Sequence, residues 1–212
     1  VYAEYERVKH ERSVMDLDDV LVYLIGLLAD NDDVLSQVRR SYRHLTVDEF
    51  QDTSLLQFTL LQLWAGPRRD ICVVGDPAQS IYGFAGADPR FLRDFEDLFP
   101  GAEVFRLGQS YRCAPQIVAV ADAVSDAQES FSAVAGAQQG CVSELIVDAD
   151  SAELTAVCEL VAARLAAGVP AQEVAVLARA QERVGQLETA LRAAGVPVVM
   201  RGSAGFFERR EV

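Results

Sequence analysis

The sequence predicts an α/β fold in which parallel sheets are flanked by helices, and three observations support this prediction. After Leu45, short apolar stretches alternate with longer stretches whose apolar residues recur at helical spacing. Several apolar stretches lead directly into acidic or glycine-containing segments, as at the ligand-binding ends of parallel strands. Before Leu45 the apolar pattern is helical. We therefore expect a helical lead-in followed by α/β units.

Residues 1–42 form the predicted helical segment, which leads into the first α/β unit. Asp16 is expected to be an N-cap, because apolar residues at helical spacing follow it directly. These residues are Leu17, Val20, Leu21, Leu24, Leu27 and Leu28.

Residues 43–124 are predicted to contain the first run of alternating strands and helices. Strands are expected at residues 44–47, 70–76 and 103–108, and helices at residues 55–64, 89–99 and 114–124. Residues 125–140 are polar and rich in small side chains, so we expect a linker there.

Residues 141–212 are predicted to start a second α/β unit. Strands are expected at residues 141–148, 173–178 and 196–202, and helices at residues 152–168 and 184–195. The alternation stops in the charged sequence FFERREV, so we expect this unit to be the first part of a domain.

The composition is that of a globular protein and excludes several kinds of site. No apolar run reaches the roughly 18 residues that a membrane span requires, and the N-terminal residues do not resemble a signal peptide. We expect a cytoplasmic protein without a membrane partner. The four cysteines form no CxxC pair, so buried reduced thiols are expected, and His10 and His44 are too few for a metal cluster. The net charge of -13 argues against a nucleic-acid partner, because phosphate contacts require a basic surface. It does not exclude a local basic groove.

The sequence VDEFQDT (residues 47–53) places two carboxylates, Asp48 and Glu49, at the end of a short apolar stretch. Adjacent acids at a strand end suit a magnesium ion and an attacking water. A Walker A loop, which would hold the phosphates, needs a lysine after a glycine-rich turn. The single lysine of this chain, Lys9, has no such turn before it. The sequence therefore predicts half of a nucleotide site.

A second apolar stretch runs into DPAQSIYGFAGADP (residues 76–89). In this loop Gln79 is placed to sense a phosphate oxygen. Tyr82 and Phe84 offer flat faces on which the bases of a single strand can stack without sequence readout.

Three fragments carry a family resemblance in their order and separation. The fragments HLTVDEFQDT, VVGDPAQSIYGFAGA and FRLGQSYRCAPQIV resemble motifs II, III and IV of superfamily 1 DNA helicases of the UvrD/PcrA/Rep type. DLDDVL (residues 16–21) resembles the helix before motif II, and GFFERREV (residues 205–212) resembles the end of the first part of the second motor domain. The resemblance implies a RecA-like fold of the P-loop NTPase type, with an incomplete first motor domain and the start of a second.

The resemblance also implies roles for individual residues. Asp48 and Glu49 correspond to the acids at the magnesium ion, and Glu49 corresponds to the general base that orients the attacking water. Gln79 corresponds to the glutamine that couples the γ-phosphate to the DNA groove. Tyr111 corresponds to a residue that stacks on adenine, and Arg112 to an arginine finger, whose loss typically costs on the order of 10³–10⁵ in rate.

The implied DNA-binding residues are Tyr82 and Phe84, and here the chain departs from the family pattern. Family members often have tryptophan at the position of Phe84 and commonly arginine at the position of Ala85. Nothing in the chain resembles motifs I and Ia or the later motifs V and VI. The resemblance thus implies that the chain is the central part of a helicase that uses ATP and Mg²⁺ and acts on single-stranded and duplex DNA. The role associated with this family is DNA repair. Residues 1–212 alone are expected to be inactive.

Structural roles for the same residues remain open at this stage. The acids at 48 and 49 are also able to form a solvated turn before a helix that starts near Ser54. Tyr82, Phe84 and Tyr111 are able to pack in a core, Arg112 is able to form a surface ion pair, and Asp76 is expected to fix its own turn.

Two other functions also remain: a non-catalytic nucleic-acid-binding or regulatory module, and the motor part of a helicase–nuclease of the RecB or AddA kind.

Overall fold

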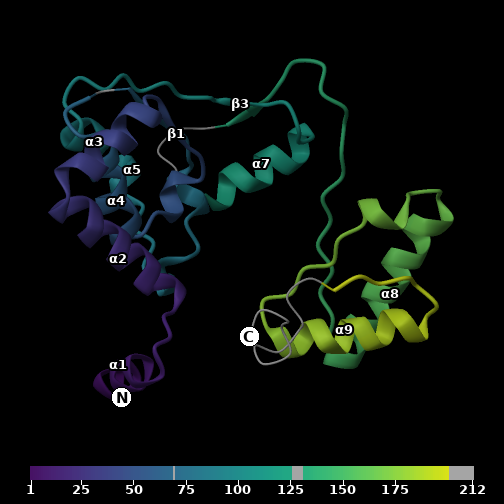
Figure 1. Cartoon of the computed structure of the whole chain (residues 1–212). Helices are drawn as coiled ribbons and strands as arrows, with labels where there is room; N and C mark the ends of the chain where they lie inside the picture. Colours follow the sequence, from purple (N-terminus) through teal and green to yellow (C-terminus); the bar gives the residue numbers. More distant parts are fainter. Residues whose placement is uncertain (69, 126–130, 201–212) are drawn as a thin grey trace. The chain divides into compact units, whose positions relative to one another are not determined.

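The computed structural model describes residues 1–68, 70–125 and 131–200. Contacts along the chain divide it into two compact units, Val1–Val142 and Ser143–Val212. Unit 1 contains the helices α1 to α7 and two short parallel sheets, and unit 2 contains α8 and α9 (Figure 1).

The central sheet of unit 1 is a parallel pair. Strand β1 (Leu45–Val47) pairs with β2 (Ile71–Val73) in the register Leu45↔Ile71 and Val47↔Val73. Parallel strands need a crossover connection, and α4 (Leu55–Ala65) supplies it. Both strands were predicted from sequence, and both are confirmed. Because they are parallel neighbours, the loops that follow them lie at the same edge of the sheet.

One face of this sheet packs against an aromatic core. Buried Phe50, Phe58, Leu61 and Phe95 form the core, and apolar side chains of β1 and β2 pack against it. The rings of Phe58 and Phe91 are stacked with centroids 4.2 Å apart. Two short helices, α5 (Arg90–Arg93) and α6 (Phe95–Leu98), contribute to this core, where one continuous helix was expected at residues 89–99.

Three helices precede the sheet, as the helical lead-in predicts. They are α1 (Tyr2–Arg12), α2 (Leu17–Asp30) and α3 (Asp32–Ser41). Asp16 is the N-cap of α2, with a capping box in which Asp16 and Asp19 each accept the other's backbone N–H. Helices α2, α3 and α4 share a second core of buried Leu28, Leu35 and Leu60. Within α2, Leu17 is 87% exposed, so the buried stripe is narrower than the sequence pattern predicted.

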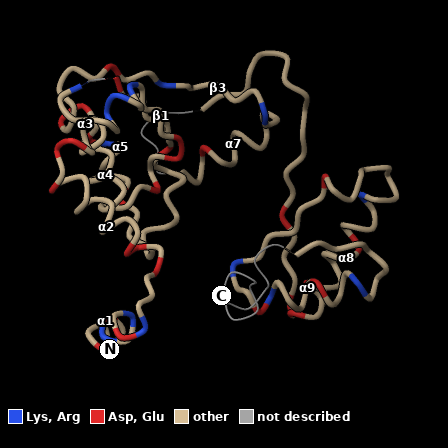
Figure 2. Tube along the Cα trace, viewed as in Figure 1, with Lys and Arg blue, Asp and Glu red and all other residues tan. Residues whose placement is uncertain are grey.

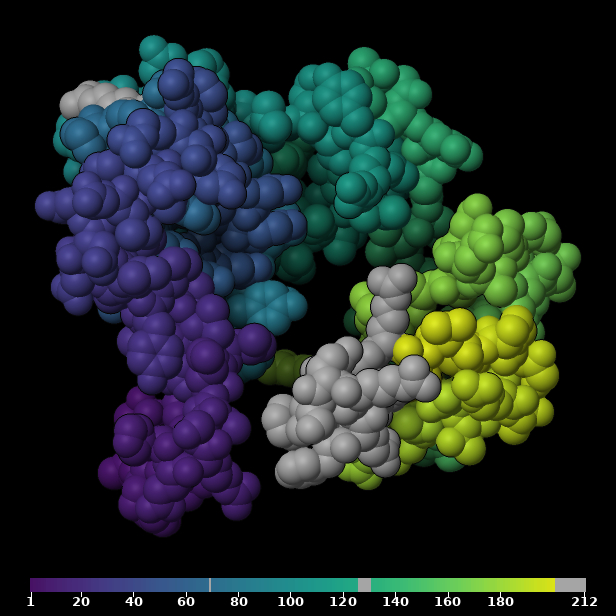
Figure 3. Space-filling model, viewed as in Figure 1, coloured from purple at the N-terminus to yellow at the C-terminus, as the bar shows by residue number. Residues whose placement is uncertain are grey.

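Helix α1 is held to the start of α2 by charge. The ammonium group of buried Lys9 forms ion pairs with Glu6, Asp16 and Asp19 at 2.8–3.0 Å. Figure 2 shows acidic and basic residues intermixed along α1, and Figure 3 shows α1, in dark purple, at one end of unit 1.

The rest of unit 1 contains a second parallel pair. Strand β3 (Gln109–Ser110) pairs with β4 (Ser132–Ala133), and α7 (Pro115–Val124) lies between them in the chain. Strand β4 falls within residues 125–140, where a linker was expected.

Unit 2 consists in its described part of two packed helices. They are α8 (Asp150–Ala166) and α9 (Gln181–Ala193), and both were predicted. Arg183 of α9 forms ion pairs with Asp150 and Glu153 of α8. The buried apolar side chains of the described part of this unit are Val161, Leu187 and Leu191.

Four of the predicted strands are wrong within the described residues. Residues 103–108, 141–148, 173–178 and 196–200 have no strand assignment. A strand needs a hydrogen-bonded neighbour, and no described segment pairs with these. Their apolar side chains are accordingly exposed, including Phe105, Ile146, Leu177 and Val199. The last residues of the final predicted strand and the whole of GFFERREV lie outside the described residues.

The prediction of buried thiols is also wrong for two cysteines. All four cysteines are free; Cys72 and Cys141 are exposed, and Cys113 and Cys158 are half-buried. Cys72 lies on β2 between half-buried Ile71 and Val73, so its side chain projects from the sheet face opposite the aromatic core. Trp64 is half-buried and packs on the core of α2, α3 and α4. Within the described residues, no helix is long and apolar enough to cross a membrane.

Candidate active site

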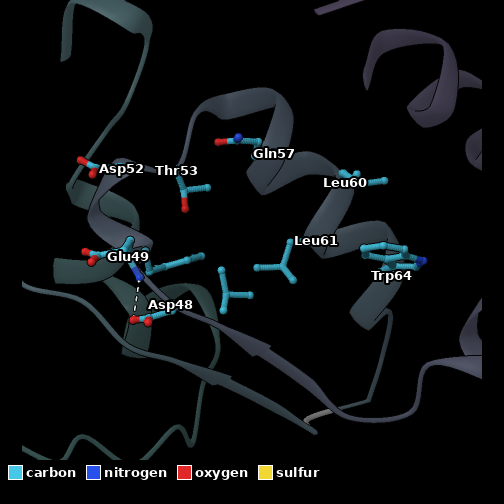
Figure 4. A pocket seen from close by; sticks show the side chains of 10 residues that line it. Asp48, Glu49, Asp52, Thr53, Gln57, Leu60, Leu61 and Trp64 are labelled. Atoms are coloured by element: carbon cyan, nitrogen blue, oxygen red, sulfur yellow. Dashed lines mark hydrogen bonds between the residues drawn. The ribbon is translucent and has the colours of Figure 1, made fainter. Parts of the chain in front are cut away.

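The two adjacent acids lie immediately after β1. Asp48 and Glu49 are both exposed, and the Asp48 Oδ1 atom accepts the Glu49 backbone N–H at 2.9 Å (Figure 4). Glu49 has a φ of 52°, in the left-handed region that a residue with a side chain rarely adopts. The chain therefore turns sharply at Glu49, and both carboxylates are left in solvent.

The residue after this turn fixes it to the core. Phe50 is fully buried, and its backbone N–H donates to the Val74 carbonyl oxygen at 2.9 Å. A short 3₁₀ helix (Phe50–Asp52) follows, and Ser54 then caps α4 through a capping box with Gln57. A helix that starts near Ser54 was predicted and is confirmed. Asp48 and Glu49 lie before the 3₁₀ helix, and the cap of α4 is Ser54 itself.

A cavity of about 380 Å³ lies between the end of β1 and α4. Asp48, Glu49 and Asp52 line one side, and Leu61 and Trp64 line the other (Figure 4). Asp52 Oδ1 and Trp64 Nε1 are buried without a hydrogen-bond partner within the described part of the chain. The carboxylates therefore border a space with both polar and apolar walls.

The loop after β2 begins beside these acids. Asp76 Oδ1 accepts the Ala78 backbone N–H at 3.0 Å, and Asp76 Oδ2 accepts from Gln79 Nε2 at 2.9 Å. The prediction that Asp76 fixes its own turn is therefore confirmed. Gln79 is exposed on a 3₁₀ turn (Pro77–Gln79), with its amide held by Asp76.

No role was predicted for Gln51, although this residue joins the two loops. Its side chain is 1% exposed and bonds to Glu49 at one end and to Asp76 at the other. The signal in the sequence was an amide two residues after the acid pair, which alone gives no indication of burial.

The two predicted DNA-contacting aromatics lie together on the surface. Tyr82 is 49% exposed and Phe84 is 88% exposed, with ring centroids 6.1 Å apart. Phe84 therefore does not pack in the core of the described part. Nearby, Arg90 is bound by Asp88 at 2.6 Å, and hydrogen bonds from Arg90 lower the pKa of Asp88 to about 2.

Tyr111 and Arg112 lie on the turn between β3 and α7. Both are exposed, and Tyr111 is 79% exposed, so it does not pack as a core residue. Within the described residues, no hydrogen bond or ion pair joins either side chain to Asp48, Glu49 or Gln79. The structure thus brings the first two motifs together and leaves the third without a direct link to them.

The chemistry of the acid pair fits a magnesium ion. Each carboxylate keeps one oxygen free of hydrogen bonds to described residues, because Asp48 uses Oδ1 and Glu49 uses Oε2. Magnesium is usually bound through one or two carboxylates together with substrate phosphates and water. No cluster of three or more His, Cys, Asp or Glu side chains able to hold a metal occurs within the described ranges.

Comparisons with known proteins agree across the whole chain. Residues 1–100 match the UvrD/REP helicase N-terminal domain, and residues 105–212 match the UvrD-like helicase C-terminal domain. The chain is 38% identical to the ATP-dependent DNA helicase UvrD2 of Mycobacterium tuberculosis, covering 100% of this chain and 32% of the relative. It is 30% identical to the ATP-dependent DNA helicase PcrA of Staphylococcus epidermidis, covering 100% of this chain and 30% of the relative. The chain thus spans about a third of the length of these relatives.

Proposed function

Because this chain belongs to the UvrD-like family of DNA helicases, which implies RecA-like α/β motor domains, we propose that the protein is an ATP-dependent DNA helicase or translocase. It couples ATP hydrolysis to movement along single-stranded DNA and to duplex unwinding, in DNA repair. One observation carries this proposal: Asp48 and Glu49 lie at the carboxyl end of β1, directly beside the Asp76–Gln79 loop of its parallel neighbour β2.

The acid pair carries the hydrolysis step. Glu49 orients the water that attacks the γ-phosphate and takes up its proton, and its exposed carboxylate is accessible for this role. Asp48 would hold a magnesium ion, directly or through water, and the ion would supply positive charge at the phosphates. Gln79 senses the γ-phosphate. Tyr111 stacks on the adenine, and Arg112 stabilises the charge of the transferring phosphoryl group.

The same loop connects the nucleotide to DNA. Tyr82 and Phe84 follow Gln79 by three and five residues, and their exposed rings support stacking on single-stranded bases. The two motor domains close on ATP and reopen after hydrolysis, and this cycle alternates their grip on the strand.

The two motor domains divide within this chain. We assign residues 1–42 to a helical segment, 43–124 to the first motor domain, 125–140 to a linker and 141–212 to the second motor domain. The proposed linker lies between the boundary of the two family matches at residues 100–105 and the contact boundary at Val142.

Residues 1–212 alone are not expected to hydrolyse ATP. A P-loop lysine is needed at the β- and γ-phosphates, and the single lysine, Lys9, is bound to Glu6, Asp16 and Asp19 instead.

Glu49→Gln tests the proposal in the full-length protein that contains this sequence. The substitution keeps the side-chain shape but removes the basic oxygen. We expect ATP turnover that is stimulated by single-stranded DNA in the wild type and falls roughly 10²–10⁴-fold in the variant. The measurement is steady-state ATP hydrolysis with and without oligodeoxythymidine, on protein free of contaminating ATPase.

Glu96→Gln is the matched control, since it makes the same charge change at an exposed acid of α6. We expect it to retain wild-type turnover. Absence of turnover in the full-length wild type would instead favour a non-catalytic nucleic-acid-binding or regulatory module, and turnover by residues 1–212 alone would disprove their inactivity.

A further inference from the structure

A buried amide connects the two loops that border the candidate active site. The Gln51 side chain is 1% exposed and is among the largest fully buried side chains of the described residues. Burial of an amide is unfavourable unless its donor and acceptor are hydrogen-bonded, so the bonds of Gln51 determine why it is there.

Both ends of this amide have partners in different loops. Gln51 Nε2 donates to Glu49 Oε2 at 2.7 Å, and Gln51 Oε1 accepts the Asp76 backbone N–H at 3.0 Å. Only one amide orientation satisfies both bonds, because a carboxylate must accept and a backbone N–H must donate. The first bond fixes one oxygen of Glu49 and leaves Oε1 directed away from Gln51.

The surrounding backbone is shaped to hold the amide. A Cβ atom at Gly75 would lie 2.5 Å from Gln51 Oε1, so glycine allows the segment after β2 to approach the amide this closely. The Ser80 hydroxyl donates to the Gln51 carbonyl oxygen at 3.2 Å. Gln51 is therefore held at its side chain and at its backbone.

The bonds continue beyond Gln51 to the next loop. Asp76, whose N–H binds Gln51, also binds the side chain of Gln79 at 2.9 Å. A continuous series of hydrogen bonds thus runs from Glu49 through Gln51 and Asp76 to Gln79.

We propose that Gln51 is a positioning residue that orients the Glu49 carboxylate for the attacking water and fixes it to the Asp76–Gln79 loop. This inference rests on the proposed function, because it takes Glu49 as the general base. Gln51 itself does not touch the nucleotide. Its loss is expected to slow hydrolysis while nucleotide binding is retained.

Gln51→Met in the full-length protein tests this role, because methionine keeps the volume and removes both hydrogen bonds. We expect the DNA-stimulated kcat to fall roughly 10- to 100-fold, while the KM for ATP stays within about threefold. Gly75→Ala also displaces the Gln51 amide, with a further close contact of 2.9 Å to Leu92 Cδ2, and is expected to lower kcat as well. Glu96→Gln, at an exposed acid of α6, is the control that retains kcat.

Two further readouts separate positioning from loss of folding. Amide hydrogen exchange across residues 75–80 is expected to accelerate in Gln51→Met, since the Asp76 N–H loses its acceptor, and to stay unchanged in Glu96→Gln. In a double-mutant cycle, adding Gln51→Met to Glu49→Gln is expected to cause little further loss of kcat, because both act through one carboxylate. A merely structural role would give additive losses.

The outcomes distinguish this inference from the proposed function. If Glu49→Gln collapses turnover while Gln51→Met and Gly75→Ala keep wild-type kcat, or if the cycle is additive, the positioning role is overturned and the proposed function stands. If Glu49→Gln itself retains turnover, the proposed base is wrong and the role of Gln51 is overturned with it.

Discussion

At the scale of single residues, the chain places a strained acid beside a fully buried aromatic ring. Glu49 at φ 52° carries a conformational cost of roughly 1–2 kcal/mol for a residue with a side chain. The neighbouring Phe50 offsets this cost, since its ring contacts Phe95 edge-on at 5.8 Å between centroids. The position of the candidate base therefore depends on the packing of the residue that follows it.

Phe50→Ala is expected to lower the free energy of unfolding of unit 1 by about 3–5 kcal/mol, because it leaves a cavity in the aromatic core. Urea unfolding followed by the fluorescence of Trp64, the only tryptophan, measures this change. Phe84→Ala is the matched control: that ring is 88% exposed, so a shift below about 0.5 kcal/mol is expected. Equal losses in the two variants would contradict this account of the core.

Local features of the site were predictable from the sequence, whereas features that depend on distant contacts were not. The turn at the acid pair and the start of α4 near Ser54 were predictable, because each depends on neighbours within a few residues. The role of Gln51 was not, because its acceptor oxygen bonds a residue 25 positions away. The exposure of Cys72 likewise could not be predicted, because it depends on which distant segment covers that face of the sheet.

At the scale of elements, the helices were predicted more reliably than the strands for the same reason. A helix such as α9 makes its hydrogen bonds within its own segment, so its spacing and length are visible in sequence. A strand is defined by a neighbour, and residues 173–178 have strand-like composition without one in the described chain.

The junction of α1 with α2 is an element held by charge rather than by apolar packing. Burial lowers the pKa of the Lys9 ammonium, but its hydrogen bonds to Asp19, Glu6 and Asp16 outweigh this and raise it. The backbone N–H of Asp19, followed by the Tyr5 hydroxyl and Lys9, lowers the pKa of Asp16 from 3.8 to about 2.

We expect this junction to weaken in acid. Because the pKa of Asp16 is lower in the folded chain, its stabilisation is fully present above about pH 4 and is lost as the pH falls through about 2. Hydrogen exchange in α1, corrected for intrinsic rates, should therefore accelerate between pH 5 and pH 2. In Asp16→Asn, α1 should exchange faster already at pH 5, with a smaller further change in acid. A wild-type rate in that variant would contradict the role of Asp16.

At the scale of the whole molecule, the described parts of the two units differ in how much apolar surface they bury. Among the described residues, unit 1 has one core around Phe50 and one around Leu28, built on four and three buried residues. In the described part of unit 2, the buried apolar residues are Val161, Leu187 and Leu191. Since burial contributes about 25 cal/mol per Å² of apolar surface, unit 2 is expected to be the less stable unit.

Unfolding of residues 1–212 in urea should therefore occur in two transitions. Trp64 lies in unit 1 and packs on the core of α2, α3 and α4, whereas circular dichroism at 222 nm also reports on α8 and α9 of unit 2. We expect part of the dichroism signal to be lost at urea concentrations where Trp64 fluorescence is unchanged. Leu187→Ala should move only this first transition to lower urea, because Leu187 is buried in unit 2. Superimposable single transitions by the two probes would show instead that the two units unfold as one cooperative body.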